Sequence, residues 1–148
     1  MTLIDLIDED VVKVPLEHTG KAEVLRELLD TLADTGKLSE VERAYNALLE
    51  RESQGSTGLE HGIAVPHAKT DAVETLTVAI GISPNGIEFG AMDGQPSKLF
   101  FLLLAPPGQS GPHLEALSEI ARLSRSEAFL RALISSRSPA DVLELLRE

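Results

Sequence analysis

The chain has 148 residues, of which 43% are hydrophobic and 25% are charged, a composition typical of folded proteins and not of disordered ones. Its 24 acidic and 13 basic residues give a formal net charge of -11, and a field of that sign repels nucleic acid and anionic lipid, so neither is expected as a partner. The sequence contains no cysteine, which excludes thiol catalysis, disulfides and cysteine-ligated metal sites and fits the reducing cytoplasm.

This length is sufficient for one hydrophobic core, and we expect a single domain over residues 1–148. The N-terminus, MTLIDLIDED, has neither the basic start nor the long apolar run of a signal peptide. The longest apolar stretch, LFFLLLAPP, is too short to span a bilayer, so no direct membrane insertion is expected.

The first third of the chain predicts a short strand and two helices. Residues 11–14 (VVKV) form an apolar run that ends at a proline. Residues 20–35 carry leucine and valine at helical spacing, and Gly36 stands where a helix C-terminus favours glycine. A second helix follows, for which Ser39 and Glu42 have the spacing of a capping box.

The middle of the chain predicts strands. The run IAV at residues 63–65 is short and β-prone, and ETLTVAIGIS at 74–83 is a longer strand pattern. The turn residues SPNG follow at 83–86, so IEF at 87–89 is predicted to pair back as a hairpin. The run KLFFLLLA at 98–105 has no polar alternation, which indicates a central strand covered on both faces.

The last third is helical. One helix, over residues 112–123, places Leu114 and Leu117 on its apolar face, and two more begin at the capping serines Ser126 and Ser138. Because helices precede, interrupt and follow the strands, we predict an α/β fold with a single mixed β-sheet flanked by helices on both faces.

Two histidines stand where loops meet regular structure. His67 comes directly after the strand predicted at 63–65, and Pro66 gives it a stiff backbone. His113 lies in the first turn of the helix at 112–123, where free N–H groups and the helix dipole favour an anion and disfavour an imidazolium. We therefore expect His113 to be neutral and able to donate a hydrogen bond to a phosphate oxygen.

Arg51 precedes a loop of small residues, GSTG, at 55–58. A guanidinium offers forked donors that match phosphate oxygens, and the hydroxyls of Ser56 and Thr57 are candidate phosphate-loop donors. A nucleophilic imidazole beside such groups suits a transient phosphohistidine, because much of an imidazole is deprotonated at neutral pH and its N–P bond remains labile.

Several segments together resemble one known family. The segment RESQGSTGLEHGIAVPHAKTDAV, residues 51–73, is similar to the signature of the fructose/mannitol-type EIIA domains of the bacterial phosphoenolpyruvate-dependent sugar phosphotransferase system (PTS). The opening LIDEDVV, the region GIEFGAMDGQPSKLFFLLLAPP and the segment HLEALSEIARL extend the likeness, in the same order, over nearly the whole chain.

This resemblance implies a phosphotransferase component that works through a phosphohistidine, with neither a cofactor nor a metal. His67 matches the phosphoryl acceptor of the family, which receives the group from the phosphocarrier HPr and passes it to an EIIB partner for sugar uptake. His113 and Arg51 match the residues that hold the phosphoryl group. The sugar is expected to be selected by the membrane partner.

Two positions depart from the family pattern. His61 stands where many relatives have asparagine, and Ala68 replaces a common glycine after the acceptor, but neither change removes an assigned role. His61 precedes His67 by six residues, and we interpret it as a surface histidine in preference to a partner of the acceptor. Lys69 and Asp71 are interpreted as solvated residues on the rim.

Two alternatives stay open at this point. The same acceptor site would serve a regulatory, nitrogen-type EIIA, a phosphorylation sensor that acts by binding target proteins. A metal site is the other alternative, since His61, His67, His113 and Asp71 are ligand types that suit zinc, although they lack a short metal-binding spacing.

Overall fold

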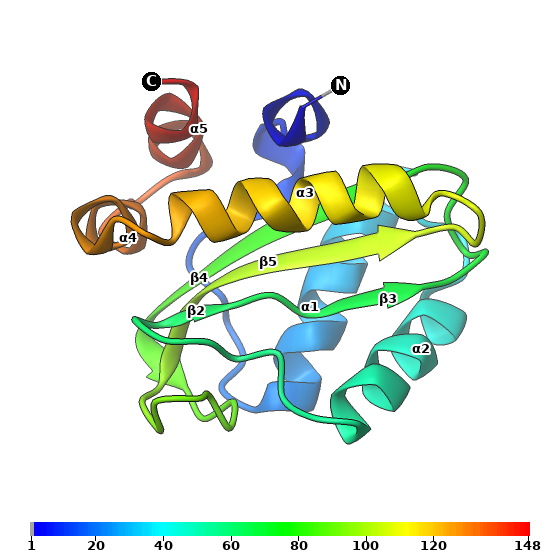
Figure 1. Ribbon diagram of the computed structural model, residues 1–148, viewed down its shortest axis with the longest axis horizontal. Coiled ribbons are helices and arrows are strands. Elements are labelled where there is room, and N and C mark those ends of the chain that lie inside the picture. Colours follow the sequence, from blue (N-terminus) through cyan, green and yellow to red (C-terminus); the bar gives the residue numbers. More distant parts are fainter. Residues whose placement is uncertain (1) are drawn as a thin grey trace.

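The computed structural model describes residues 2–148, and Figure 1 shows their path. The elements follow one another in the order η1 (Leu3–Leu6), η2 (Glu9–Val11), β1 (Val12–Lys13), α1 (Lys21–Asp34), α2 (Val41–Ser53), β2 (Ile63–Ala64), β3 (His67–Lys69), β4 (Thr77–Ile87), β5 (Ser97–Ala105), α3 (Ser110–Leu123), α4 (Glu127–Ile134) and α5 (Pro139–Arg147), where η1 and η2 are short 3-10 helices.

One mixed sheet organises the fold, as the sequence predicts. Its centre is the antiparallel pair β4 and β5, and β1 lies parallel to β4 at one edge. At the other edge both β2 and β3 pair with β5 in parallel, first at Leu99 and Phe100 and then from Leu103 to Ala105. The two short strands therefore act as one edge strand with an interruption.

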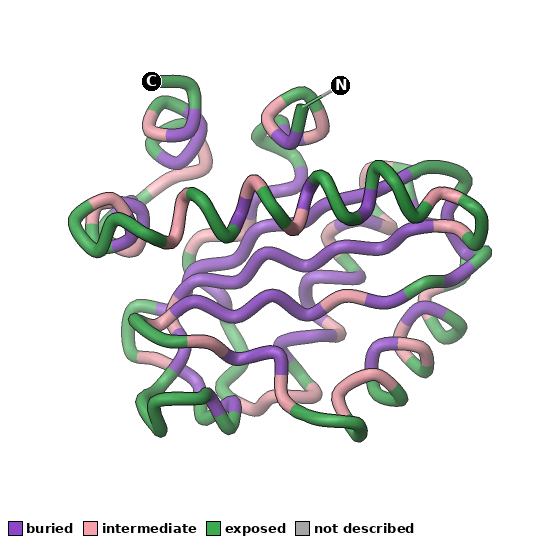
Figure 2. Tube along the Cα trace, viewed as in Figure 1, coloured by how far each residue is buried: buried purple, intermediate pink, exposed green. Residues whose placement is uncertain are grey.

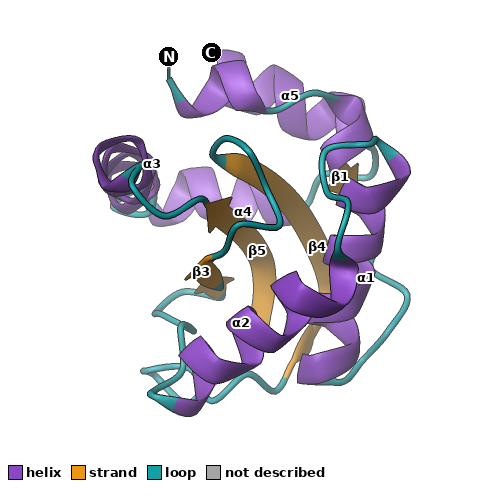
Figure 3. Ribbon diagram, turned by 90° about the vertical axis from the view of Figure 1, so that its right-hand side faces the viewer, coloured by secondary structure: helices purple, strands orange, loops and turns teal. Residues whose placement is uncertain are grey.

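Helices cover both faces of this sheet. Figure 3 shows α1 and α2 on one side of β4 and β5 and α3 and α4 on the other, which confirms the predicted layers. Strand β5 is completely buried from Leu99 to Ala105, and the burial colours of Figure 2 follow β4 and β5 through the centre of the molecule. The prediction of a central strand covered on both faces is therefore confirmed.

Local sequence signals set the ends of several helices. Helix α1 ends where the sequence predicts, and Gly36 adopts a left-handed φ of 81° that glycine accepts without strain. The predicted serine caps are also present, because the side chain of Ser126 accepts a hydrogen bond from Phe129 N and that of Ser138 accepts one from Asp141 N.

The capping box predicted for α2 is wrong. The helix begins at Val41 after Glu40, and no side chain caps it. The carboxylate of Glu42, which the box requires, instead lies 2.6 Å from Nη1 of Arg26 on α1. An ion pair with the neighbouring helix has replaced the local hydrogen bond.

The hairpin predicted at SPNG is also wrong in its position. Residues 83–86 remain inside β4 as an irregularity, with Gly86 at a φ of 85°, and Ile87 pairs with Ser97 of β5. The chain reverses later, between β4 and β5. The longer pairing with β5 overrides the local turn signal, as a bulge permits.

No helix within residues 2–148 has the length and apolar character needed to cross a membrane.

Candidate functional site

The interrupted edge strand presents His67. Pro66 has no N–H to donate, so the ladder breaks between β2 and β3, although the carbonyl of Pro66 still accepts from Leu103 N at 2.9 Å. Alternation along β3 then buries Ala68 and turns His67 and Lys69 to the opposite side. His67 is half-buried on a backbone fixed from both sides.

A hydrogen bond determines which nitrogen of His67 is available. Nδ1 lies 2.7 Å from the carbonyl oxygen of Val65. A carbonyl can only accept a hydrogen bond, so Nδ1 carries the proton. In the neutral ring the other nitrogen, Nε2, then keeps its lone pair and is the nucleophilic atom.

His113 lies beside this ring, in the first turn of α3. The two ring centroids are 5.5 Å apart and the rings meet edge to face, with 77° between their planes. His113 is only 5% exposed, and its Nε2 has no hydrogen-bond partner among residues 2–148. A buried ring nitrogen without a partner is costly unless a ligand completes it.

The electrostatics of His113 agree with a neutral ring. Its pKa is lowered from the ordinary value of 6.5, first by burial and then by the charges of His67 and Lys69. The sequence predicts a neutral His113 from its place at a helix N-terminus. In the structure the pKa is lowered, which also favours the neutral ring, but the main cause is burial.

Both histidines line a groove of about 660 Å³ between α2 and α3. Figure 1 shows β3 between these two helices. Arg51, at the end of α2, also lines the groove, and its Nη1 donates to the carbonyl of Gly55 at 2.9 Å. The structure thus brings together His67, His113 and Arg51, the three residues that the sequence analysis associates with a phosphoryl group.

The side chains of α3 that face the core are not all the ones that the sequence predicts. Leu114, predicted to face the core, is 64% exposed and lines the groove with Leu117 and Ala47. The core face of α3 is formed instead by His113, Ala116 and Ile120. Because His113 belongs to the buried face, its successor in the chain turns outward.

Ser56 and Thr57 do not line the groove, so their assignment as phosphate-loop donors is corrected. The Ser56 hydroxyl donates to the carbonyl of Phe89 at 2.6 Å. The Thr57 hydroxyl donates to the buried carboxylate of Glu52, which also pairs with Lys21 Nζ at 2.8 Å. These hydroxyls hold the loop in place and are not free for a ligand.

Thr57 has a second structural contact that reaches the acceptor. Its carbonyl oxygen accepts from Val65 N at 3.0 Å, and the carbonyl of the same Val65 accepts from His67. The small-residue loop therefore positions His67 through the backbone. From the sequence, the hydroxyls of this loop are predicted to bind phosphate directly. Their actual partners, Glu52 and Phe89, become recognisable only in the folded chain.

The four candidate metal ligands do not come together. His61 lies on the surface, 3.5 Å from the carboxylate of Glu127, and Asp71 pairs with Arg43 at 2.8 Å. Within the described part of the chain, no three His, Asp or Glu side chains are arranged to hold a metal ion. The interpretation of His61 as a surface histidine agrees with this placement.

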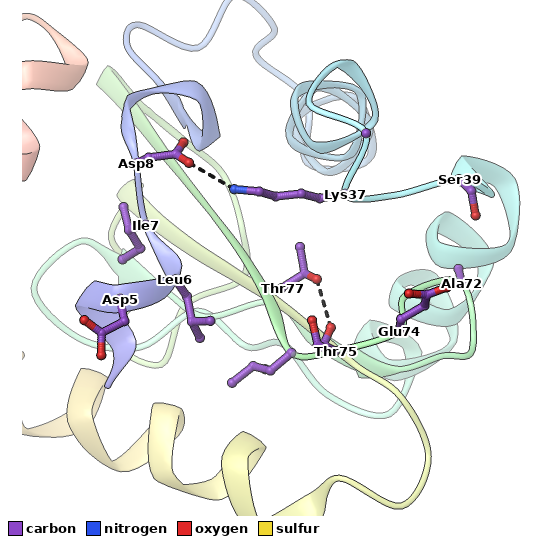
Figure 4. A pocket seen from close by; sticks show the side chains of 12 residues that line it. Asp5, Leu6, Ile7, Asp8, Lys37, Ser39, Ala72, Glu74, Thr75 and Thr77 are labelled. Atoms are coloured by element: carbon purple, nitrogen blue, oxygen red, sulfur yellow. Dashed lines mark hydrogen bonds and ion pairs between the residues drawn. The ribbon is translucent and has the colours of Figure 1, made fainter. Parts of the chain in front are cut away.

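A second cavity, of about 480 Å³, lies between the N-terminal segment and the start of β4 (Figure 4). Its charged side chains include Asp8 and Lys37, which pair with each other at 3.1 Å. No histidine lines it. The groove with His67 and His113 therefore remains the candidate site.

The family model of the phosphoenolpyruvate-dependent sugar phosphotransferase system, EIIA 2, matches residues 5–148. The fructose-specific EIIA component of Haloferax volcanii is 42% identical over 82% of this chain and 79% of its own length. The fructose-specific EIIABC component of Bacillus subtilis is 34% identical over the whole of this chain, which spans 23% of that longer protein.

Solved structures show the same fold. The nitrogen regulatory protein IIA-Ntr from Neisseria meningitidis has a TM-score of 0.89 at 28% identity, covering 97% of this chain and 98% of that one. Enzyme IIA-Mtl of Escherichia coli, in its complex with phosphorylated enzyme IIB-Mtl, has a TM-score of 0.81 at 25% identity, covering 95% and 96%. With a family model matched over residues 5–148 and a histidine pair in the groove, the chain belongs to the EIIA 2 family of the phosphoenolpyruvate-dependent sugar phosphotransferase system.

Proposed function

We propose that this single EIIA domain, residues 1–148, carries a phosphoryl group on His67, receiving it from the phosphohistidine of HPr and passing it to an EIIB partner. The observation that best supports this function is that the two neighbouring histidine rings differ in the hydrogen bonding of their nitrogens. His67 offers a proton-free Nε2, and next to it the buried His113 holds an Nε2 without a partner.

The transfer is a displacement at phosphorus. The lone pair of His67 Nε2 attacks the phosphorus atom, the N–P bond of the donor breaks, and its electron pair stays with the donor imidazole. His67 keeps the proton on Nδ1, where Val65 O accepts it and stabilises the positive charge that the ring shares while it carries the phosphoryl group. The onward step reverses these events, with the EIIB nucleophile as the attacking group.

His113 and Arg51 stabilise the group during transfer. A neutral His113 with its proton on Nε2 donates to a phosphoryl oxygen, which satisfies a buried ring atom that lacks a partner among residues 2–148. Arg51 supplies a guanidinium from the other side of the groove. Catalysis is then positioning and electrostatics, and no metal is required.

The surroundings of His67 fit exchange with two protein partners in turn. The groove is open, and Leu114 extends an apolar side chain beside it. The solved complex of Escherichia coli IIA-Mtl with phosphorylated IIB-Mtl supports an EIIB protein as the acceptor. We place this exchange in the cytoplasm, because a chain without cysteine suits a reducing compartment.

A regulatory role is the second candidate. The structural likeness to IIA-Ntr of Neisseria meningitidis, with a TM-score of 0.89, favours it, while the fructose-specific relatives favour sugar uptake. Both roles use the same acceptor, and the presence of a cognate EIIB that takes the group from this chain distinguishes them.

Intact-mass measurement tests the proposal. The protein is incubated with phosphoenolpyruvate, enzyme I and HPr, and we expect the mass of one phosphoryl group, lost on brief acid treatment. His67→Ala should gain nothing, whereas His61→Ala, a surface control, should label as the wild type does. Unchanged labelling of His67→Ala would overturn the assignment.

A further inference from the structure

Lys69 follows the acceptor by two residues on β3 and lies on the same side of the strand. Its ammonium group reaches across to α3, where Nζ donates to the hydroxyl of Ser110 at 3.1 Å. Both residues line the groove that holds His67 and His113. Resting on the function proposed above, we propose that Lys69 is a further phosphoryl-binding residue, which leaves Ser110 and contacts the phosphoryl group when His67 carries it.

The charge balance of the groove supports a second cation. A phosphoryl group adds about 1.5 to 2 negative charges at neutral pH. The groove also contains the carboxylate of Glu50, so Arg51 and the positive charge shared by the phosphorylated His67 ring leave part of the added charge uncompensated. His113 contributes a hydrogen bond but, as a neutral ring, no charge. In the described part of the chain, Lys69 is the remaining lysine or arginine that lines this groove.

The placement of Ser110 makes a change of partner feasible. Ser110 precedes His113 by three residues on α3, so the two side chains lie on the same side of the helix. The hydrogen bond therefore holds the ammonium group next to His113. The charge of Lys69 is felt there, as the third contribution to the lowered pKa of His113. The flexible stem of a lysine and its rotatable N–H donors allow it to exchange a hydroxyl for a phosphoryl oxygen.

The resting hydrogen bond is weak enough to be exchanged. Lys69 is exposed and its partner is a neutral hydroxyl, whereas a phosphoryl oxygen offers an ionised acceptor. The bond to Ser110 already has an ionised donor, but only the phosphoryl oxygen adds Coulomb attraction between opposite charges. Phosphorylation of His67 therefore favours the new contact.

The test compares Lys69→Met and Lys69→Arg with the control Lys13→Met. Lys13 lies on β1, at the opposite edge of the sheet, so its substitution changes the net charge equally without touching the groove. We expect Lys69→Met to lower the second-order rate of phosphorylation by phospho-HPr about tenfold, the effect of losing one charged hydrogen bond, with partial recovery in Lys69→Arg. If Lys69 acts only as a long-range charge, the difference in rate between the wild type and Lys69→Met should disappear at high salt. If Lys69 contacts the phosphoryl group, most of that difference should remain.

Phosphorus NMR gives a second readout that a purely structural role would not change. A cation in contact with the phosphoryl group lowers the pH at which that group takes up its proton, so Lys69→Met should raise this midpoint and Lys13→Met should leave it unchanged. Ser110→Ala, which removes the resting partner and leaves the ammonium group, should slow phosphorylation less than Lys69→Met does.

The outcomes separate this inference from the function on which it rests. If wild-type protein is not phosphorylated on His67, the proposed function fails. If it is, and Lys69→Met matches the wild type in both rate and NMR midpoint, the role of Lys69 is refuted while the carrier function stands. If Ser110→Ala is as slow as Lys69→Met, the bond between the two residues is a structural bridge and the exchange is refuted.

Discussion

The ring of His113 meets the ring of His67 edge to face, with centroids 5.5 Å apart, and it does so from inside the protein. Two imidazolium rings at this separation repel each other, so protonation of one opposes protonation of the other. A charged ring beside a neutral one agrees with the two roles proposed above, one ring to carry the phosphoryl group and one to donate a hydrogen bond to it.

The first prediction concerns His113. His113→Ala removes the donor but leaves the nucleophile, so the protein should still be labelled, with a rate of labelling and of onward transfer to EIIB about a hundredfold lower, as for other lost donors to a transferring group. His113→Gln, which keeps an N–H donor, should recover part of the rate. Rapid-quench assays of both steps measure this. Equal rates for His113→Ala and the wild type would remove His113 from the mechanism.

The second prediction concerns stability against pH. The pKa of His113 is lowered in the folded protein, so below the ordinary value of 6.5 the unfolded chain binds a proton that the native ring refuses. The unfolded state then binds more protons at this group, so the contribution of His113 to the free energy of unfolding is lost as the pH decreases from about 7.5 to about 5.5. Urea unfolding across this range measures the slope.

His113→Gln provides the control for that slope. The variant has no ring to protonate, so the decrease in this pH range should be smaller than in the wild type. Glu27 also has a shifted pKa: burial raises it, but hydrogen bonds from Glu17 and His18 lower it further, so that it lies below the ordinary value of 4.5. The stability that Glu27 contributes is therefore lost only below pH 4.5, outside the range of this experiment. The same slope in both proteins would show that His113 is not the group responsible.

The third prediction concerns the apolar rim. Leu114→Ser removes an exposed side chain next to the acceptor, so the apparent KM for phospho-HPr should rise about tenfold while the free energy of unfolding stays within about 0.5 kcal/mol of the wild type. Met92, 72% exposed and outside the groove, provides the matched variant Met92→Ser, which should behave as the wild type. A common effect of both changes would argue against docking at this rim.

The fourth prediction concerns the loop that positions His67. Thr57→Val removes the hydroxyl that donates to the buried Glu52 carboxylate and should lower the free energy of unfolding by about 1–3 kcal/mol. Thr19→Val, at an exposed threonine, should change it little. Chemical denaturation compares the two variants, and similar values for both would show that the buried network contributes nothing measurable.

Local patterns predict the parts of the fold that depend on neighbours in the chain. Gly36, the serine caps at Ser126 and Ser138, and the run of apolar residues in β5 are of this kind. The errors arise where a distant residue competes. Arg26 takes the carboxylate of Glu42 from its capping box, and β5 holds the SPNG segment in a strand.

In the candidate site, too, some residues can be predicted from the sequence and others cannot. His67, His113 and Arg51 can be found from the sequence because their surrounding motifs resemble a known family. The hydroxyls of Ser56 and Thr57 have the right chemistry for phosphate, but contacts with Phe89 and Glu52 occupy them. The proximity of Lys69 to Ser110 could not be anticipated, because the sequence predicts this helix only from residue 112, whereas the structure begins it at Ser110.

The most direct test of the account is to locate the phosphoryl group by NMR in the protein labelled through phosphoenolpyruvate, enzyme I and HPr. Since Val65 O fixes the proton on Nδ1 of His67, we predict phosphorus coupling to Nε2 of that ring and to no nitrogen of His113. Phosphorus on Nδ1 of His67, or on either nitrogen of His113, would contradict it.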